Sequence, residues 1–474
     1  MRKTFDTYIL PTGRLRLSSI FKSFFWFAAL CIGFSISTLT LAESERTDLI
    51  QIYNEAILND AQLSAARHHY ESFKEKIPQA RAGLLPTINS SAKVADVNQQ
   101  TSYSRGARTD SIFQANLIQP LFRSDRWFQL EVAHASVAKT ELELKAKEQS
   151  LIITVAQTYL EALRALDTLA ASKAEETALQ RQHRRAQGRL IGGAASVTDL
   201  LDASAAFDNA NANRKLAERM VEDALGQLSR LTGQNYAWLE GIGHQLPVLP
   251  PDPPDVNIWI DKAIENNLLL QASSFSVDAA KHTIRQRKAG FAPTLDTVLS
   301  YRRGNDAIGF NNDRGHASQR SIALELNIPL YSGGMVRSQV REATEQLAQS
   351  QQEREDRRRE TILNTRQLYR TVNSDIEQIK AKRQSIRSSR TATLSNKIGW
   401  ERGVRNFSDV LNAQRLLYIV VKEYNNARYD YIINTLKLKQ AAGILSPLDL
   451  QSLNNYFSKD YDFEKDFLPP DAPS

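Results

Sequence analysis

Gln79-Ala-Arg-Ala-Gly-Leu-Leu-Pro-Thr87 returns 207 residues later as Gln286-Arg-Lys-Ala-Gly-Phe-Ala-Pro-Thr294, and this duplication decides the fold. Other matched positions keep almost the same offset: Pro120 with Pro329, Gly193 with Gly403, and Gly233 with Gly443. The 474-residue chain therefore contains one unit of about 180 residues twice. Such a repeat indicates a structure built around an axis rather than around a catalytic cleft.

The first 42 residues are predicted to be an export signal peptide. Basic residues precede the apolar run 24–39, and Thr40-Leu-Ala42 is a small-residue cleavage site. An uncleaved membrane anchor is the alternative. The segment holds the only cysteine, Cys31, together with five basic residues and one acidic residue. Without it the net charge falls from +7 to +3, so composition gives no support for nucleic-acid binding.

Each repeat is predicted to contain a helix, two short strands and a very long helical pair. The first helix covers 49–82 with a kink at Pro78, and its counterpart covers 259–289. The predicted first repeat covers 43–233, with strands 85–99 and 110–120 and helices 124–191 and 196–232. A linker covers 234–257. The predicted second repeat covers 258–443, with strands 293–303 and 318–329 and helices 334–399 and 406–442, and it is followed by a C-terminal segment and tail over 444–474. Polar loops, Gln99–Asp110 and Gly304–Ser318, join the strands of each pair.

The predicted strands alternate between apolar and polar residues. In Ser321–Ile328, four aliphatic side chains face one way, while Ala323, Glu325 and Asn327 face the other. This pattern suits a membrane barrel wall and also a half-buried soluble sheet. The export signal, and the presence of only four such strands among several hundred helical residues, favour the barrel.

The long helices are predicted from an absence of helix breakers. Ser124–Ile191 contains no proline and a single glycine, so a continuous helix would reach about 100 Å. Its apolar residues recur at spacings of three and four, as in coiled coils. Four strands cannot close a barrel, and eight would leave no lumen. A trimer with twelve strands is therefore the smallest assembly that makes a pore.

Taken together, these features resemble those of the TolC-like outer-membrane channels. The resemblance rests on the two strand entries Gly83-Leu-Leu-Pro86 and Gly290-Phe-Ala-Pro293, on the segment Ile328–Val340, on the paired helix tips and on Tyr429–Gly443. It implies a homotrimer in the outer membrane of a Gram-negative bacterium, with a 12-stranded β-barrel in lipid continued as an α-helical periplasmic tunnel. It also implies a periplasmic adaptor (membrane fusion) protein and an inner-membrane ABC or RND-type transporter as partners, in type I protein secretion or drug efflux.

The resemblance also implies a gate at the periplasmic tips, lined by aspartate rings. Asp409 matches one ring, whereas the second ring position falls on the uncharged Asn412. Crowded carboxylates raise one another's pKa and concentrate cations. A cation preference weaker than that of a two-ring channel is therefore expected.

A latch and a docking site are implied at the same tips. Arg405 and Trp400 occupy the latch positions, with Asp199 and Thr198 as acceptors; the family has Tyr at the position of Trp400. The alternative role for Asp199 is a helix cap, because Ser196-x-x-Asp199 has the pattern of a capping box. The turns at Gly193 and Gly403 are expected to receive the adaptor, although a plain helix end would equally explain each glycine.

Two other classes of function compete with the channel. An enzyme is disfavoured because the seven histidines are scattered and no nucleophile, metal-ligand or phosphate-binding motif occurs. The sequence therefore predicts no catalytic residue, no metal site and no cofactor. A periplasmic coiled-coil scaffold without a pore needs only the long helices, and the amphipathic strands argue against it. The sequence does not encode the cargo.

Overall fold

The computed structural model describes residues 46–101, 104–193, 196–305 and 317–469, so the predicted signal peptide lies outside the described chain. The helices are α1 (Leu49–Asn59), α2 (Ala61–Lys74), α3 (Lys76–Ala82), α4 (Ser124–Ile191), α5 (Val197–Thr232), α6 (Val256–Asn266), α7 (Leu268–Lys288), α8 (Met335–Glu401), α9 (Phe407–Ala441), α10 (Pro447–Asn454) and α11 (Phe463–Asp466). None of these described helices is long and apolar enough to cross a membrane.

The first helical stretch of each repeat is interrupted, which the sequence prediction missed. In the first repeat it divides into α1, α2 and α3, with breaks at Asp60 and Glu75 rather than a kink at Pro78. Asp60 accepts a hydrogen bond from Leu63 N at 2.6 Å, and Asn267 does the same for Leu270 N at 3.0 Å, so each side chain starts a new helix. Pro78 lies in the first turn of α3, where no backbone N–H is needed.

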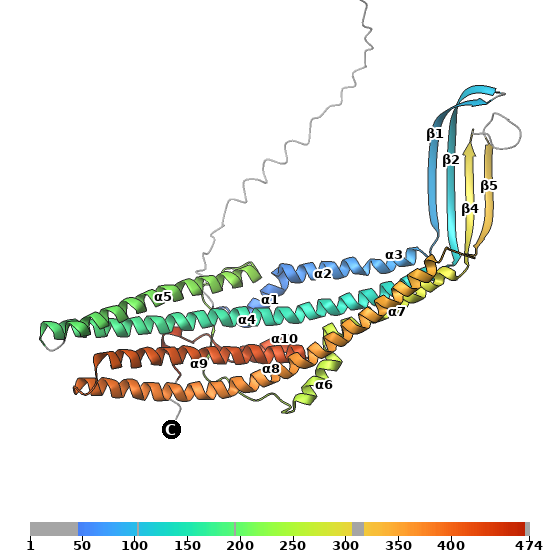
Figure 1. Ribbon diagram of the computed structural model, residues 1–474. Coiled ribbons are helices and arrows are strands. Elements are labelled where there is room, and N and C mark those ends of the chain that lie inside the picture. The colour runs from blue at the N-terminus through green and yellow to red at the C-terminus, as the bar shows by residue number, and fades with distance from the viewer. Residues whose placement is uncertain (1–45, 102–103, 194–195, 306–316, 470–474) are drawn as a thin grey trace, which may run out of the picture. The chain divides into compact units, whose positions relative to one another are not determined.

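Four long strands form one antiparallel sheet in the order β1-β2-β4-β5 (Figure 1). Their bounds are β1 (Thr87–Thr101), β2 (Ser104–Phe122), β4 (Thr294–Gly304) and β5 (Ala317–Asn327). The β1–β2 hairpin runs through most of Gln99–Asp110, which was wrongly expected to be a loop. Cross-strand bonds such as Thr109 Oγ1 to Asp96 Oδ1, at 2.6 Å, continue its ladder beyond the end of β4.

The strand register separates the two faces of the sheet. One row across all four strands is apolar and consists of Ile88, Leu117, Leu299 and Ile322. The next row points the other way and is polar; it consists of Asn89, Asn116, Ser300 and Ser321. Ser300 and Ser321 hydrogen bond across the strands at 2.6 Å. This is the arrangement of a membrane barrel wall, with one face for lipid and one for water.

The long helices form two antiparallel pairs, α4–α5 and α8–α9 (Figure 1). The two pairs pack against each other through α4 and α9, so the four helices form one layer with α5 and α8 at its two edges. Nearer the strands, α7 packs between α4 and α8, while α2 and α3 pack on the other side of α4. In the sheet and in the helical layer alike, the elements of the first repeat therefore lie towards one edge, and those of the second repeat lie towards the other.

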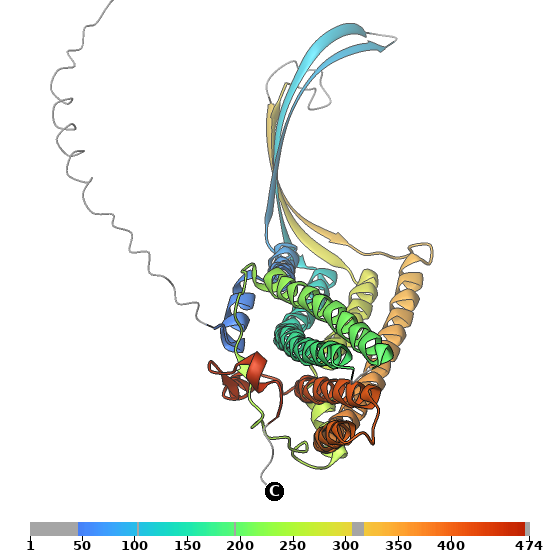
Figure 2. The same ribbon diagram turned by 90° about the vertical axis from the view of Figure 1, so that its left-hand side faces the viewer.

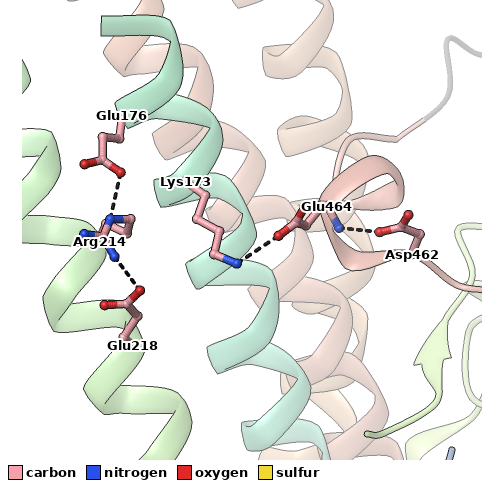
Figure 3. A network of polar contacts seen from close by, with 6 residues as sticks. All are labelled: Lys173, Glu176, Arg214, Glu218, Asp462 and Glu464. Atoms are coloured by element: carbon pink, nitrogen blue, oxygen red, sulfur yellow. Dashed lines mark hydrogen bonds and ion pairs between the residues drawn. The ribbon is translucent and has the colours of Figure 1, made fainter. Parts of the chain in front are cut away.

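A small second sheet and the C-terminal segment bind the middle of the helices. β3 (Gly241–Ile242) pairs with β6 (Phe457–Ser458). Lys173 on α4 contacts Glu464 on α11 at 2.8 Å (Figure 3). On another side of α4, Arg214 on α5 pairs with Glu176 at 2.7 Å. These contacts hold α4 between the C-terminal segment and α5.

A buried polar cluster lies beneath this segment. Asp167 accepts hydrogen bonds from Tyr429 at 2.7 Å and from Tyr461 at 3.5 Å. Burial raises the pKa of Asp167 to about 6, although both hydrogen bonds and the charge of Arg428 favour the carboxylate. Burial, followed by the Arg428 charge, lowers the pKa of His244 to about 4. At neutral pH the cluster therefore contains a carboxylate, a guanidinium and a neutral imidazole.

Candidate gate at the helical tips

The tip of the second pair is a tight, fully hydrogen-bonded turn. α8 ends at Glu401, and Gly403 adopts a left-handed conformation with φ of 77°. Val404 N donates to Gly399 O at 2.9 Å, and Gly403 N donates to Trp400 O at 3.0 Å, which together make a Schellman motif. Gly193, with φ of 71°, makes the bond equivalent to that of Gly403, from its N to Leu190 O at 3.0 Å. Both glycines therefore have a sufficient local reason in backbone geometry.

The returning helices begin with matched acidic caps. The Asp199 carboxylate accepts from Ser196 N at 3.3 Å, and the Asp409 carboxylate accepts from Asn406 N, also at 3.3 Å. Both aspartates are half-buried in the single chain. The capping role weighed for Asp199 is thus present, and Asp409 shares it. Capping does not exclude a second role in an assembled pore, because each carboxylate can accept further bonds.

Trp400 has partners that the sequence did not suggest. The Arg189 guanidinium lies over its indole at 4.6 Å from the ring centre, and the Phe407 ring lies 5.1 Å away. Phe407 is only 4% exposed and packs in a small apolar core with residues of α4 and α5. Each tip is therefore joined to the other within one chain, through aromatic packing and a cation–π contact.

Buried alanines allow the close approach of the helices at the tips. In α5 the buried positions Ala203, Ala210 and Ala217 are spaced by seven, as are Leu179 and Ala186 in α4. A seven-residue spacing keeps small side chains along one seam of a helical pair. This signal was present in the sequence, but it is easily overlooked because large apolar residues dominate periodicity.

The remaining predicted site residues lie exposed at the tips. Arg405, Asn412 and Thr198 are exposed, and the stem of Arg405 packs against Gly399. Within one chain, among the residues described, no ion pair joins Arg405 to Asp199. Arg405 lies on the turn between α8 and α9, whereas Asp199 lies on α5, at the edge of the layer opposite to α8.

A sheet with one apolar face and two open edges, joined to long helical pairs, defines a protomer of an outer-membrane channel. The family model described as "Outer membrane efflux protein" matches residues 52–234 and 259–444. The chain belongs to this family, which places it in the outer membrane and extending into the periplasm.

Relatives and a solved structure agree with this membership. Outer membrane protein TolC of Vibrio cholerae serotype O1 is 31% identical over 432 residues, covering 90% of this chain and 97% of its own length. Alkaline protease secretion protein AprF of Pseudomonas aeruginosa is 29% identical over 414 residues, covering 85% and 86%. The outer membrane channel CmeC of Campylobacter jejuni superposes with a TM-score of 0.73 at 16% identity, covering 88% of each chain, and so supports the fold.

Proposed function

We propose that this protein is a trimeric exit duct for type I protein secretion or multidrug efflux. In this proposal it opens at its helical tips when a periplasmic adaptor and an inner-membrane ABC or RND-type transporter engage it. It performs no catalysis and needs no cofactor. The names of the relatives support export as the activity, since one is an alkaline protease secretion protein.

The observation that carries the proposal is the pair of open edges. Among the described strands, β1 and β5 each have a single neighbour. Unpaired backbone groups are not tolerated in lipid, so β5 of one chain must meet β1 of the next. Because the edges are different, the contact is head-to-tail and closes a ring. Three chains give twelve strands, with the polar rows lining the lumen.

The ring also brings the latch residues together. The α8–α9 pair of one chain would meet α5 of its neighbour, which carries Asp199 and Thr198. Arg405 would then reach an acceptor that its own chain does not offer it. The turns at Gly193 and Gly403 would present the surface for the adaptor.

A pore and a scaffold differ in their response to charge on the sheet. Purified protein in planar bilayers is expected to conduct, and Ile322→Arg is expected to prevent stable insertion, because a lipid-facing arginine costs about 2–4 kcal/mol at the membrane midplane. Ser321→Arg, one residue away on the polar face, should insert normally. A protein that stays soluble without detergent would support the scaffold instead. Equal insertion of the two variants would contradict the assignment of the lipid-facing side of the sheet.

The latch is tested by Arg405→Ser. Loss of the cation is expected to raise the single-channel conductance of the trimer, because it removes the ion pair that holds the tips of neighbouring chains together. An ion pair near the surface contributes about 0–1 kcal/mol. Arg402→Ser, on the same turn, serves as the control for lost charge. Equal conductance in wild type and Arg405→Ser would reject the latch without rejecting the pore.

A further inference from the structure

The connection from β5 to α8 carries an exposed apolar surface beside an arginine. Figure 2 shows this connection running from the end of β5 to the start of α8. Leu330 is 92% exposed and Tyr331 is 88% exposed. With Phe291 and Pro329 they line a cavity of about 160 Å³, which Arg337 also lines.

This surface continues the lipid-facing side of the sheet. On β5, Leu324 and Leu326 follow Ile322 on the apolar face, and Ile328 and Leu330 keep the same alternation beyond the strand. The cavity therefore lies where the apolar face of β5 ends and α8 begins.

The charge in the cavity is not neutralised by the protein. Within the described chain, the Arg337 guanidinium has no ion-pair or hydrogen-bond partner, and the first turn of α8 holds no acidic residue. The equivalent connection in the first repeat differs, because Arg123 pairs there with Asp296 at 3.1 Å and lies 3.6 Å from Asp125. At the same offset of 209 residues, the second repeat has Ser332 in place of Arg123 and Gly334 in place of Asp125. Its cation comes instead from Arg337, which has no acidic residue beside it in the first turn of α8.

We propose that this cavity binds the headgroup of a phospholipid from the periplasmic leaflet of the outer membrane. Arg337 holds the phosphate, and the Leu330 and Tyr331 side chains contact the glycerol and the first methylenes. The cavity of about 160 Å³ has room for a phosphate group beside Arg337, and the apolar residues of β5, Leu324 and Leu326, do not line it. The chains therefore lie outside, along the apolar face of β5.

The test measures lipid retention by the delipidated full-length trimer in detergent, using native mass spectrometry and added dioleoyl phosphatidylglycerol. Wild type is expected to retain the lipid, and Arg337→Gln to bind it about tenfold more weakly, because a charge-assisted bond is lost. Arg341→Gln, an exposed arginine one turn further along α8, should behave as wild type. Equal binding by the two variants would overturn the proposal.

Two further arms identify the occupant. Dioleoylglycerol, which lacks phosphate, and glycerol 3-phosphate, which lacks chains, should each fail to compete; competition by glycerol 3-phosphate alone would instead make this a soluble-anion site. In a Tyr331→Trp variant in vesicles, phosphatidylglycerol with brominated chains should quench the new fluorescence. An unquenched tryptophan would mean that the neighbouring chain covers the surface, and would overturn lipid binding. None of these readouts depends on conductance or export.

Discussion

A Phe407→Ala variant is expected to raise the single-channel conductance several-fold. Phe407 joins the α8–α9 tip to α4 and α5, and its ring packs on Trp400. Removing a buried phenylalanine costs about 3–5 kcal/mol, which is much more than a surface ion pair contributes. The tip should therefore separate from α4–α5 while the rest of each helix stays folded. Conductance in planar bilayers, with circular dichroism to verify helix content, measures the effect.

The first repeat supplies the matched control. Val197 occupies the position equivalent to Phe407, 210 residues earlier, and is 61% exposed instead of 4%. Val197→Ala should leave conductance almost unchanged, because it removes no buried contact. If Phe407→Ala conducts no better than Val197→Ala, the aromatic contact between the tips does not restrain the pore.

An Asp409→Asn variant is expected to lose most of the cation preference of the channel, and with it most of its block by multivalent cations. In the proposed trimer only three carboxylates would line the constriction, since Asn412 carries no charge. Removing them leaves little to concentrate cations there. Reversal potentials in asymmetric potassium chloride measure the preference. Asn412→Asp should shift the preference the other way by adding a second ring.

Asp199→Asn separates this effect from helix capping. Both aspartates accept a backbone bond at 3.3 Å, so each substitution should cost about 1 kcal/mol of cap stability or less. Only Asp409 is expected to change selectivity, because the resemblance places Asp409, and not Asp199, in the aspartate ring of the constriction. Equal shifts in the two variants would show that helix ends, rather than the ring, govern ion preference.

Much of the fold could be predicted from the sequence, because its strongest signals are local. The absence of proline, and of any glycine except Gly188, over Ser124–Ile191 predicts a helix whatever it packs against, and α4 has those bounds. Alternation in Ser321–Ile328 separates the faces of β5 without knowledge of its neighbours. The mainly helical fold class with a membrane sheet is confirmed by the solved channel structures.

The misses concern features that depend on tertiary contacts. The breaks at Asp60 and Asn267 require knowing that a capping side chain outcompetes helix continuation there. The extension of β1 and β2 pairs mainly polar residues, such as Asp96 with Thr109, and so lacks the apolar alternation from which strands are predicted. At the tips, the contact of Arg189 with Trp400 joins residues 211 positions apart, and no local pattern reports it.

The different edges of the sheet have a genetic consequence. In the proposed ring each chain supplies a third of the wall, and no chain can close it alone. A chain that assembles but cannot pair β5 correctly would therefore leave an unclosed barrel in every trimer that contains it. When such a variant is made in equal amount with wild type, only about one eighth of randomly mixed trimers would be intact. Alleles that alter the outer strands should consequently be dominant, whereas alleles that prevent folding altogether should be recessive.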